Sequence, residues 1–360
     1  MSRLPKASSP HLTEGYIPAL TGLRALAAYL VFLHHHNPAL PGTLANSLFN
    51  QGYVGVSIFF VLSGFLIYHQ YANAYLSSKK WSYRKYLYHR FVRIYPIYIL
   101  LLLVTVGFHT FAGRPMRVWL FMLNLTLLKG LFESTKFSGL SQSWSLTVEV
   151  CFYGVAPLLF TGLQRWGVFR LTVGLIGVGL VLWLVAGQVV HMGSLSFFLF
   201  YTLFGRSFEF VIGMALARQW QSSVSPAHYA SRTGLCLIVS CVCWQTCVAY
   251  YSTDFTYLLI SEIVAYNGLL PIGIALFLAE LIGRKTVLLR LFAHQISQAL
   301  GRSSYAFYLI HVGVVANGLQ KLGVANYGLL FGALVGIAHA LYHFVERPLY
   351  WRLIRCPATR

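Results

Sequence analysis

About ten apolar segments, each long enough to cross a lipid bilayer, follow one another along this 360-residue chain. A helix needs about 20 predominantly apolar residues to span the hydrocarbon core, and it satisfies its own backbone hydrogen bonds there without water. The pattern therefore predicts an all-α integral membrane protein, a polytopic bundle of about ten transmembrane helices. The segments lie near residues 17–36, 52–74, 94–112, 144–164, 171–190, 197–217, 233–251, 258–282, 303–320 and 324–345.

Composition excludes an ordinary soluble domain, because 57% of the residues are hydrophobic and only 10% are charged. A net charge of +19 would suggest a nucleic-acid partner in a soluble protein. Here most of the 27 Lys and Arg fall in alternate connections between the apolar segments. The positive-inside rule then predicts that both termini are cytoplasmic. We expect membrane lipids as partners and no nucleic acid.

Residues 117–132 are apolar but short and bracketed by cations, so we predict a re-entrant or interfacial segment there. A full span at this place would reverse every later loop. No soluble domain, linker or repeat is evident, which predicts a single membrane domain over 1–360 with its core at 17–350. The six cysteines lie mostly in apolar segments, and we interpret them as small buried residues, with neither a disulfide framework nor a metal site.

The first apolar segment carries an arginine and ends in three histidines, in "LTGLRALAAYLVFLHHHNP". Arg24 and His35 are eleven residues apart, about three helical turns, which places them on one face roughly 16 Å apart. An arginine in hydrocarbon costs at least ~2.5–3.5 kcal/mol, so it persists where it faces protein or water. The face is therefore expected to be buried in the protein and functional.

Glu149, in "SWSLTVE", is predicted to lie at a depth similar to that of His35. A carboxylate beside an imidazole would orient the ring and make it more basic, as a general base requires. Alternatively, Glu149 neutralises Arg24 or another buried cation. The sequence leaves both interpretations open.

Two further sets of charges stand out. Arg206 and Glu209 are three residues apart, which favours a self-neutralising pair within one helix over substrate contact. Arg90 and Arg93 are one turn apart and precede Pro96, which we expect in the first turn of a helix; arginines at a helix N-terminus suit phosphate. Ordinary topology and contact with lipid headgroups explain the cations before them, which are Lys79, Lys80, Arg84 and Lys85.

The other polar residues are explained by ordinary structural roles. The glycines and serines of "QGYVGVSIFFVLSGFLIY" are expected to serve close helix packing, and Ser63 alone does not identify a nucleophile. His311, six residues after Tyr305, could be a satisfied core histidine. "FVERPLY" indicates the end of a helix with a local ion pair between Glu346 and Arg347. These features predict a bundle with a polar interior and do not choose between an enzyme and a transporter.

Seven motifs in order over residues 17–350 resemble the acyltransferase-3 family of membrane O-acyltransferases. The resemblance implies ten membrane helices, acetyl-CoA entering from the cytoplasm as acyl donor, and an acceptor commonly presented at the other face. Family acceptors include lipopolysaccharide, exopolysaccharide and peptidoglycan sugars, nodulation factors and macrolides. The motifs are R-x10-H (Arg24 and His35), "GYVGVSIFFVLSGFLI", "RFVRIYP", "SWSLTVE", "GRSFEF", "GRSSYAFYLIH" and "FVERPL".

By this resemblance His35 matches the family's catalytic histidine, Glu149 its S-L-x-x-E glutamate and Arg24 its arginine. His35 would mediate transfer, Glu149 would orient or charge-balance it, and Arg24 would stabilise the thioester oxygen or bind the cofactor. The expected binding residues are Arg90, Arg93 and Tyr305 for coenzyme A, and Ser63, Arg206, Glu209 and His311 for the substrate.

Two departures from the family pattern matter. Many relatives have an aspartate where this chain has Ser57. Many also carry a fused extracytoplasmic esterase-like domain, for which we expect no room here, so transfer is completed alone or through a separate acyl-accepting protein.

We therefore expect an inner-membrane O-acetyltransferase that moves acetyl from acetyl-CoA to a hydroxyl of a cell-surface or lipid-linked glycan. The alternatives are a transporter or flippase of an anionic lipid or sugar, or a succinyl- or macrolide acyltransferase.

Overall fold

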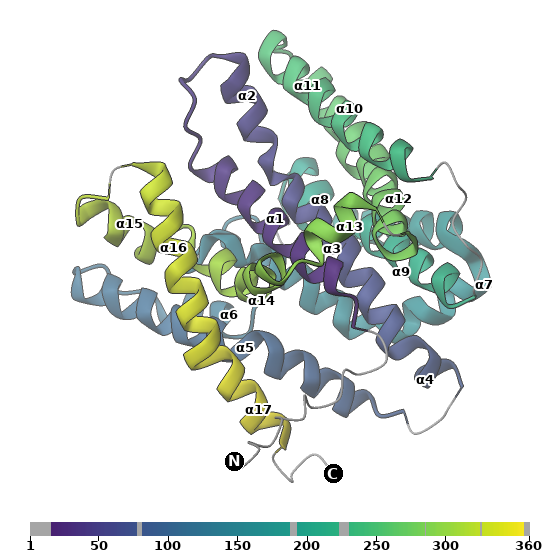
Figure 1. Ribbon diagram of the computed structural model, residues 1–360, viewed down its shortest axis with the longest axis horizontal. Helices are drawn as coiled ribbons and strands as arrows, with labels where there is room; N and C mark the ends of the chain where they lie inside the picture. The colour runs from purple at the N-terminus through teal and green to yellow at the C-terminus, as the bar shows by residue number, and fades with distance from the viewer. Residues whose placement is uncertain are drawn as a thin grey trace, which may run out of the picture.

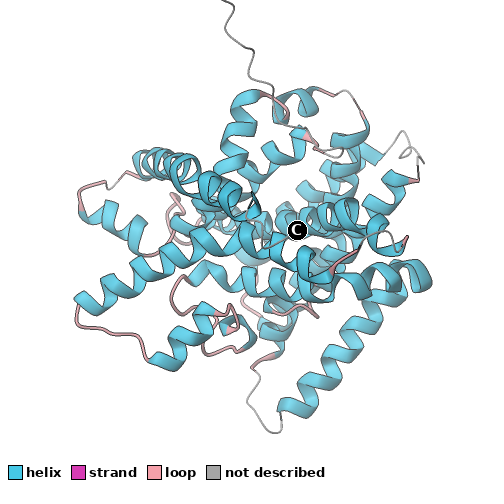
Figure 2. Cartoon of the chain, turned by 90° about the horizontal axis from the view of Figure 1, so that it is seen from below, coloured by secondary structure: helices cyan, strands magenta, loops and turns pink. Residues whose placement is uncertain are grey.

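The computed structural model describes residues 16–77, 81–187, 193–222, 230–284, 286–324 and 326–355. In these ranges every regular element is a helix (Figure 2). The predicted all-α class is confirmed. The α-helices are α1 (Pro18–His35), α2 (Leu44–Asn50), α3 (Val54–Ile67), α4 (Asn73–Leu76), α5 (Tyr83–Phe111), α6 (Val118–Leu125), α7 (Trp144–Gly187), α8 (Leu195–Tyr201), α9 (Ser207–Gln221), α10 (Ala230–Tyr251), α11 (Phe255–Glu262), α12 (Leu270–Gly283), α13 (Val287–Phe292), α14 (Gln295–Ile310), α15 (Val314–Lys321), α16 (Tyr327–Leu341) and α17 (Arg347–Arg355).

Short 3₁₀ and π-helical turns join several of these helices into longer rods. The 3₁₀ turns are η1 (Gln51–Tyr53), η3 (Lys129–Leu131) and η4 (Ser141–Ser143), and the π-helical turns are η2 (Tyr68–Ala72), η5 (Ile263–Leu269) and η6 (Tyr342–Glu346). Among the described residues, six rods are long and apolar enough to cross a membrane: Leu44–Leu76, Tyr83–Phe111, Ser141–Val185, Thr233–Tyr251, Phe255–Gly283 and Tyr327–Ile354. They contain seven of the predicted spans, because 144–164 and 171–190 share the rod of α7. The count of ten spans stays a prediction.

The rod of α7 changes direction at Gly167, where φ is 72° and ψ is −177°. Glycine adopts such a positive φ without the steric cost that a Cβ would bring. This kink is the boundary that the sequence suggested between its fourth and fifth spans.

Two predicted spans are not single helices. Near 197–217, α8 ends at Tyr201 and α9 begins at Ser207; near 303–320, α14 ends at Ile310 and α15 begins at Val314. The prediction of uninterrupted helices there is wrong. In membrane proteins broken helices occur where the freed backbone groups are buried in protein or face water, and here the buried Arg206 and His311 lie at the two breaks.

The segment 117–132 contains α6, of only eight residues, followed by a turn with Leu127 at a φ of 58°. Eight helical residues rise about 12 Å, too little to cross a hydrocarbon core of about 30 Å. The structure thus has no full span there, in keeping with the re-entrant or interfacial segment that the sequence predicts.

The basic segment before Pro96 differs from its prediction. Helix α5 begins at Tyr83, where the Ser82 hydroxyl accepts a hydrogen bond from Lys85 N at 3.4 Å, and it continues through Pro96. Arg90 and Arg93 therefore lie inside a helix and do not have the N-terminal backbone groups that we expected beside them. Lys79 and Lys80 lie outside the described residues.

Helices α1, α3, α9 and α14 form the centre of the molecule (Figure 1). Helix α3 lies between α1 and α9, and its glycines allow close backbone approach: a Cβ at Gly55 would lie 2.1 Å from Ala27 O, and one at Gly64 would lie 2.1 Å from Phe210 O. The packing role of these small residues is confirmed. Because α14 also packs on α1, both ends of α1 meet other core helices.

Candidate active site

Arg24 and His35 lie on the same uninterrupted helix, α1, as the spacing predicts. Arg24 is half-buried near the start of the helix, whereas His35 is its last residue and has an exposed side chain. The two ends of α1 therefore present two different chemical groups, each to a different set of neighbours.

The Arg24 end gathers charges from three other elements. Arg24 interacts electrostatically with Arg93 of α5, with Glu149 and Tyr153 of α7, and with Glu346 of η6. Its buried Nε has no hydrogen-bond partner among the described residues, and neither has Oε2 of Glu346. We call Arg24, Arg90, Arg93, Glu149 and Glu346 the arginine cluster; Arg90 joins it through Tyr153, which interacts electrostatically with both Arg90 and Glu149.

Glu149 belongs to this cluster. Its Oε1 accepts hydrogen bonds from the hydroxyls of Ser63, at 2.6 Å, and Tyr153. No contact between Glu149 and His35 is found in the described part of the chain. Of the two interpretations that the sequence left open, the structure brings together the residues of the second, in which Glu149 balances Arg24.

The two predicted phosphate-binding arginines differ in their surroundings. Arg90 lies over the rings of Tyr71, at 4.7 Å, and Tyr153, at 5.6 Å, and its Nη2 donates to Gln70 Oε1 at 2.6 Å. The exposed Arg93 instead interacts electrostatically with Arg24 and Glu346. Arg93 is thus the more accessible cation for an anionic ligand.

Tyr305 lies beside the arginine cluster. Its hydroxyl donates to the carbonyl of Ile94 at 2.8 Å, next to Arg93 in the chain. Tyr305 also interacts electrostatically with Glu346 and Glu149. The structure therefore brings together Tyr305 and Arg93, which the sequence proposed for one cofactor.

At the other end of α1, His35 meets His311. The Nδ1 atom of His35 is 3.0 Å from Val31 O and 3.3 Å from Nε2 of His311. His311 is fully buried and follows the last residue of α14, where the helix breaks. We call His35 and His311 the histidine pair.

Arg206 and Glu209 form a third charged set, separate from both ends of α1. Their Nε and Oε2 atoms are 2.8 Å apart, and each side chain is only 1% exposed. The Ser57 hydroxyl accepts from Arg206 Nη2 at 3.2 Å, and the guanidinium lies 5.3 Å from the centre of the Phe60 ring. The predicted pair between Arg206 and Glu209 is confirmed, with Arg206 at the N-cap of α9, and Ser57 contributes a neutral contact to it.

Comparison with known proteins identifies the family of the chain. The sequence model of a family described as an acyltransferase domain matches residues 17–345. The chain belongs to the acyltransferase-3 family.

Curated relatives of this family member include peptidoglycan O-acetyltransferases. The chain is 28% identical to the putative peptidoglycan O-acetyltransferase YrhL of Bacillus subtilis, over 93% of this chain and 55% of the relative. It is 25% identical to the peptidoglycan O-acetyltransferase OatA of Listeria monocytogenes, over 93% and 56%. It is 26% identical to the acyltransferase MdmB of Streptomyces mycarofaciens, over 92% and 91%. The chain spans about half the length of the first two relatives, and no solved structure matches it.

Sequence reasoning missed Glu346 and Tyr153 as members of this site, and it missed the neighbour of His311. Glu346 was assigned to an ion pair with Arg347, but it interacts with Arg93 and Arg24. Tyr153 was not singled out, although it lies one turn after Glu149 and donates to it. His311 was a candidate without an assigned neighbour. The i, i+4 spacing could have suggested Tyr153, whereas nothing local connects Glu346 or His311 to α1.

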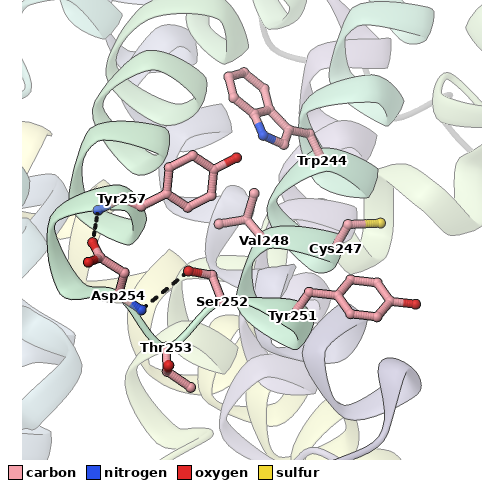
Figure 3. Close-up of a pocket in the computed structure, with 8 residues that line it drawn as sticks. All are labelled: Trp244, Cys247, Val248, Tyr251, Ser252, Thr253, Asp254 and Tyr257. Carbon is pink, nitrogen blue, oxygen red and sulfur yellow. Dashed lines mark hydrogen bonds between the residues drawn. The ribbon is translucent and has the colours of Figure 1, made fainter.

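The hollow of about 540 Å³ between α10 and α11 contains none of the candidate residues (Figure 3). Asp254 at its rim accepts a hydrogen bond from Tyr257 N at 2.7 Å and caps α11, which is a structural role. Among the described cysteines Cys236, Cys243 and Cys247 are exposed, so the expectation that they are buried is wrong for these residues of α10. In the described residues, no group of three or more His, Cys, Asp or Glu is arranged to hold a metal ion.

Proposed function

We propose that the chain is an inner-membrane O-acetyltransferase that moves acetyl from acetyl-CoA to a hydroxyl of a cell-surface or lipid-linked glycan. Membership of the acyltransferase family supports acyl transfer, and the names of the relatives support an acetyl group and a glycan acceptor such as peptidoglycan. The single observation that carries the proposal is the placement of Arg24 and His35 on α1, one beside a charged cluster and the other exposed.

The protonation of His35 suits a general base. Val31 O can only accept a hydrogen bond, so Nδ1 of the neutral ring carries the proton and Nε2 keeps its lone pair. Nε2 takes the proton of the acceptor hydroxyl as its oxygen attacks the thioester carbon. The carbon–sulfur bond breaks, and the imidazolium gives the proton to the leaving thiolate of coenzyme A. The partial negative charge at the C-terminus of α1 favours the transient imidazolium.

The arginine cluster is the proposed site for the anionic donor. Phosphates form charge-assisted hydrogen bonds with guanidinium groups; Arg24 Nε has no hydrogen-bond partner among the described residues, and Arg93 is exposed. Glu149 and Glu346 balance these cations when no phosphate is present. An extended pantetheine arm would cover the roughly 16 Å along α1 between Arg24 and His35.

The helix breaks favour a second candidate, a transporter or flippase of an anionic lipid or sugar. Discontinuous helices near a buried charged residue are typical of transporters, and α8 and α9 are separated beside Arg206. Such a protein would exchange its substrate across the membrane and cleave no thioester.

The test is release of free coenzyme A from acetyl-CoA by the purified protein in nanodiscs, with and without a glycan-lipid extract. We expect acceptor-stimulated release by the wild type and none by His35→Ala, while His34→Ala is the matched control on the next residue. Absence of both release and binding of labelled acetyl-CoA, with substrate exchange present, would establish the transporter instead. Succinyl-CoA and a macrolide acceptor in parallel reactions test the other acyltransferase classes.

A further inference from the structure

We infer that His311 is a positioning residue for His35: it fixes the tautomer and orientation of the His35 ring so that Nε2 faces the acceptor hydroxyl. This inference rests on the proposed function, in which His35 is the base. His311 itself contacts no reacting atom in this scheme, because its Nδ1 lies 2.7 Å from Tyr308 O and its Nε2 lies 3.3 Å from His35 Nδ1.

The proton positions follow from the acceptors that surround the two rings. Nδ1 of His311 is 2.7 Å from Tyr308 O, which can only accept, so Nδ1 of neutral His311 carries the proton. Nε2 of His311 then has a lone pair, and it lies 3.3 Å from Nδ1 of His35. The Nδ1 proton of His35 is therefore shared between Val31 O and His311 Nε2. Both rings carry the proton on Nδ1, which leaves Nε2 of His35 free.

Hydrogen bonds around the end of α14 fix the position of His311. Its carbonyl accepts a hydrogen bond from Nε2 of His36 at 2.7 Å, which ties the break after α14 to the end of α1. The carbonyl of Leu309 accepts a hydrogen bond from the Gln142 side chain, and the Tyr308 hydroxyl contacts Ser145 Oγ at 2.8 Å. The last turn of α14 is thus fixed to both α1 and α7.

The surroundings of His35 give this role to an imidazole and not to a carboxylate. The titratable groups that interact with His35 in the described structure are His34 and His36 on its own helix and His311 from α14. His34 donates from Nδ1 to Asn50 O at 2.6 Å, and His36 is engaged with His311 O, so neither is directed at Nδ1 of His35. Glu149, which a triad would use here, is bound to Ser63 and Tyr153.

The first experiment reads the tautomer without any reaction. Nitrogen-15 NMR of labelled histidine in nanodiscs distinguishes a protonated Nδ1 from a protonated Nε2, and His35→Ala assigns the His35 signals. We expect the Nδ1–H tautomer in the wild type and in His311→Gln, whose side-chain oxygen still accepts a hydrogen bond. His311→Phe keeps the volume but removes one of the two acceptors at Nδ1, and we expect the Nε2–H fraction to rise because Val31 O alone remains. An unchanged tautomer in His311→Phe, or Nε2–H in the wild type, overturns the inference.

The second experiment measures acetyl transfer by the same variants. We expect His311→Phe to lower kcat about 10- to 100-fold with KM for acetyl-CoA unchanged, and His311→Gln to recover much of the loss. A purely structural role would change thermal stability and KM together and would show no rescue by Gln, which also overturns the inference. If the wild type transfers no acetyl group but the tautomer responds as expected, the proposed function fails and the histidine pair stands.

Discussion

The two ends of α1 contact their neighbours through different kinds of interaction. At the Arg24 end, charged groups from α5, α7 and η6 interact electrostatically, and buried polar atoms of Arg24 and Glu346 lack hydrogen bonds within the described chain. At the His35 end, neutral rings and carbonyls meet at hydrogen-bond distances of 2.7–3.3 Å. Long charged side chains can exchange partners when an anion arrives, whereas a short-range neutral network holds one geometry.

The Arg206–Glu209 pair differs from the arginine cluster in origin and in burial. Both of its members come from neighbouring positions on one chain segment, and both are almost completely buried. The arginine cluster, in contrast, is assembled from distant segments and keeps Arg93 exposed. We therefore propose that the arginine cluster serves binding and that the Arg206–Glu209 pair serves stability.

The largest effect is expected at the His35 end. His35→Ala removes the base and should lower acetyl transfer by at least about 10³-fold. Binding of labelled acetyl-CoA in nanodiscs should stay within about twofold of wild type, because the arginine cluster is intact. His34→Ala is the control, since His34 Nδ1 donates to Asn50 O and is not directed at His35, and it should retain most of the activity. Equal losses of binding and transfer in His35→Ala would contradict the division between the two ends.

Substitution in the Arg206–Glu209 pair should change the stability of the fold and not the binding of acetyl-CoA. Arg206→Met leaves the buried Glu209 carboxylate without its partner and should destabilise the fold by about 3–5 kcal/mol. Thermal unfolding in nanodiscs measures this loss. Arg206→Met combined with Glu209→Leu removes both charges and should recover part of the stability. A stable Arg206→Met protein that has lost donor binding would move Arg206 into the binding site.

Within the arginine cluster, substitutions of Arg93 and Arg90 should affect acetyl-CoA binding to different extents. Arg93→Ala should weaken acetyl-CoA binding about tenfold, because an exposed guanidinium that can pair with a phosphate is lost. Arg90→Ala should weaken binding less and lower stability by about 1 kcal/mol, because it loses two aromatic contacts and the bond to Gln70. Titration with labelled acetyl-CoA compares the two. The opposite order would place the phosphates at Arg90.

The Glu149→Gln variant tests whether Glu149 acts on the Arg24 end or on the His35 end of α1. The amide keeps an oxygen for Ser63 and Tyr153 but removes the negative charge near Arg24. Binding of acetyl-CoA should change a few-fold, because the balance of charge around Arg24 changes, while the His35 tautomer read by nitrogen-15 NMR should not. A changed tautomer with unchanged binding would restore the interpretation in which Glu149 orients His35.

The smallest effect is expected outside both ends of α1, at Glu133. Backbone N–H and hydroxyl hydrogen bonds from Ser194, at 2.6 and 3.0 Å, lower the pKa of the Glu133 carboxyl below its ordinary 4.5. The stabilisation is present above about pH 4.5 and is lost as the pH falls through the lower folded pKa. Because the side chain is 36% exposed, the loss should be under about 1 kcal/mol. Thermal unfolding at decreasing pH should show this decrease in the wild type and not in Glu133→Gln.

Local patterns predicted much of this protein for a physical reason. Apolar segments of about 20 residues specify membrane helices wherever they occur, and the spacing of Arg206 and Glu209 places both on one face of one helix. Pro96 does not mark a helix start as predicted, because α5 continues through it. Membrane helices tolerate an internal proline when neighbouring groups satisfy the freed carbonyl.

The sequence by itself determined the helical membrane class, the lack of a full span at 117–132 and the shared helix of Arg24 and His35, since each depends on neighbours in the chain. Only the tertiary structure decided that His311, 276 residues away, meets His35, and that Glu346 joins Arg24. The breaks after α8 and α14 were also seen only in the tertiary structure. These features depend on which helices pack against α1, and that choice is set by the summed shape and polarity of distant surfaces, which no local pattern contains.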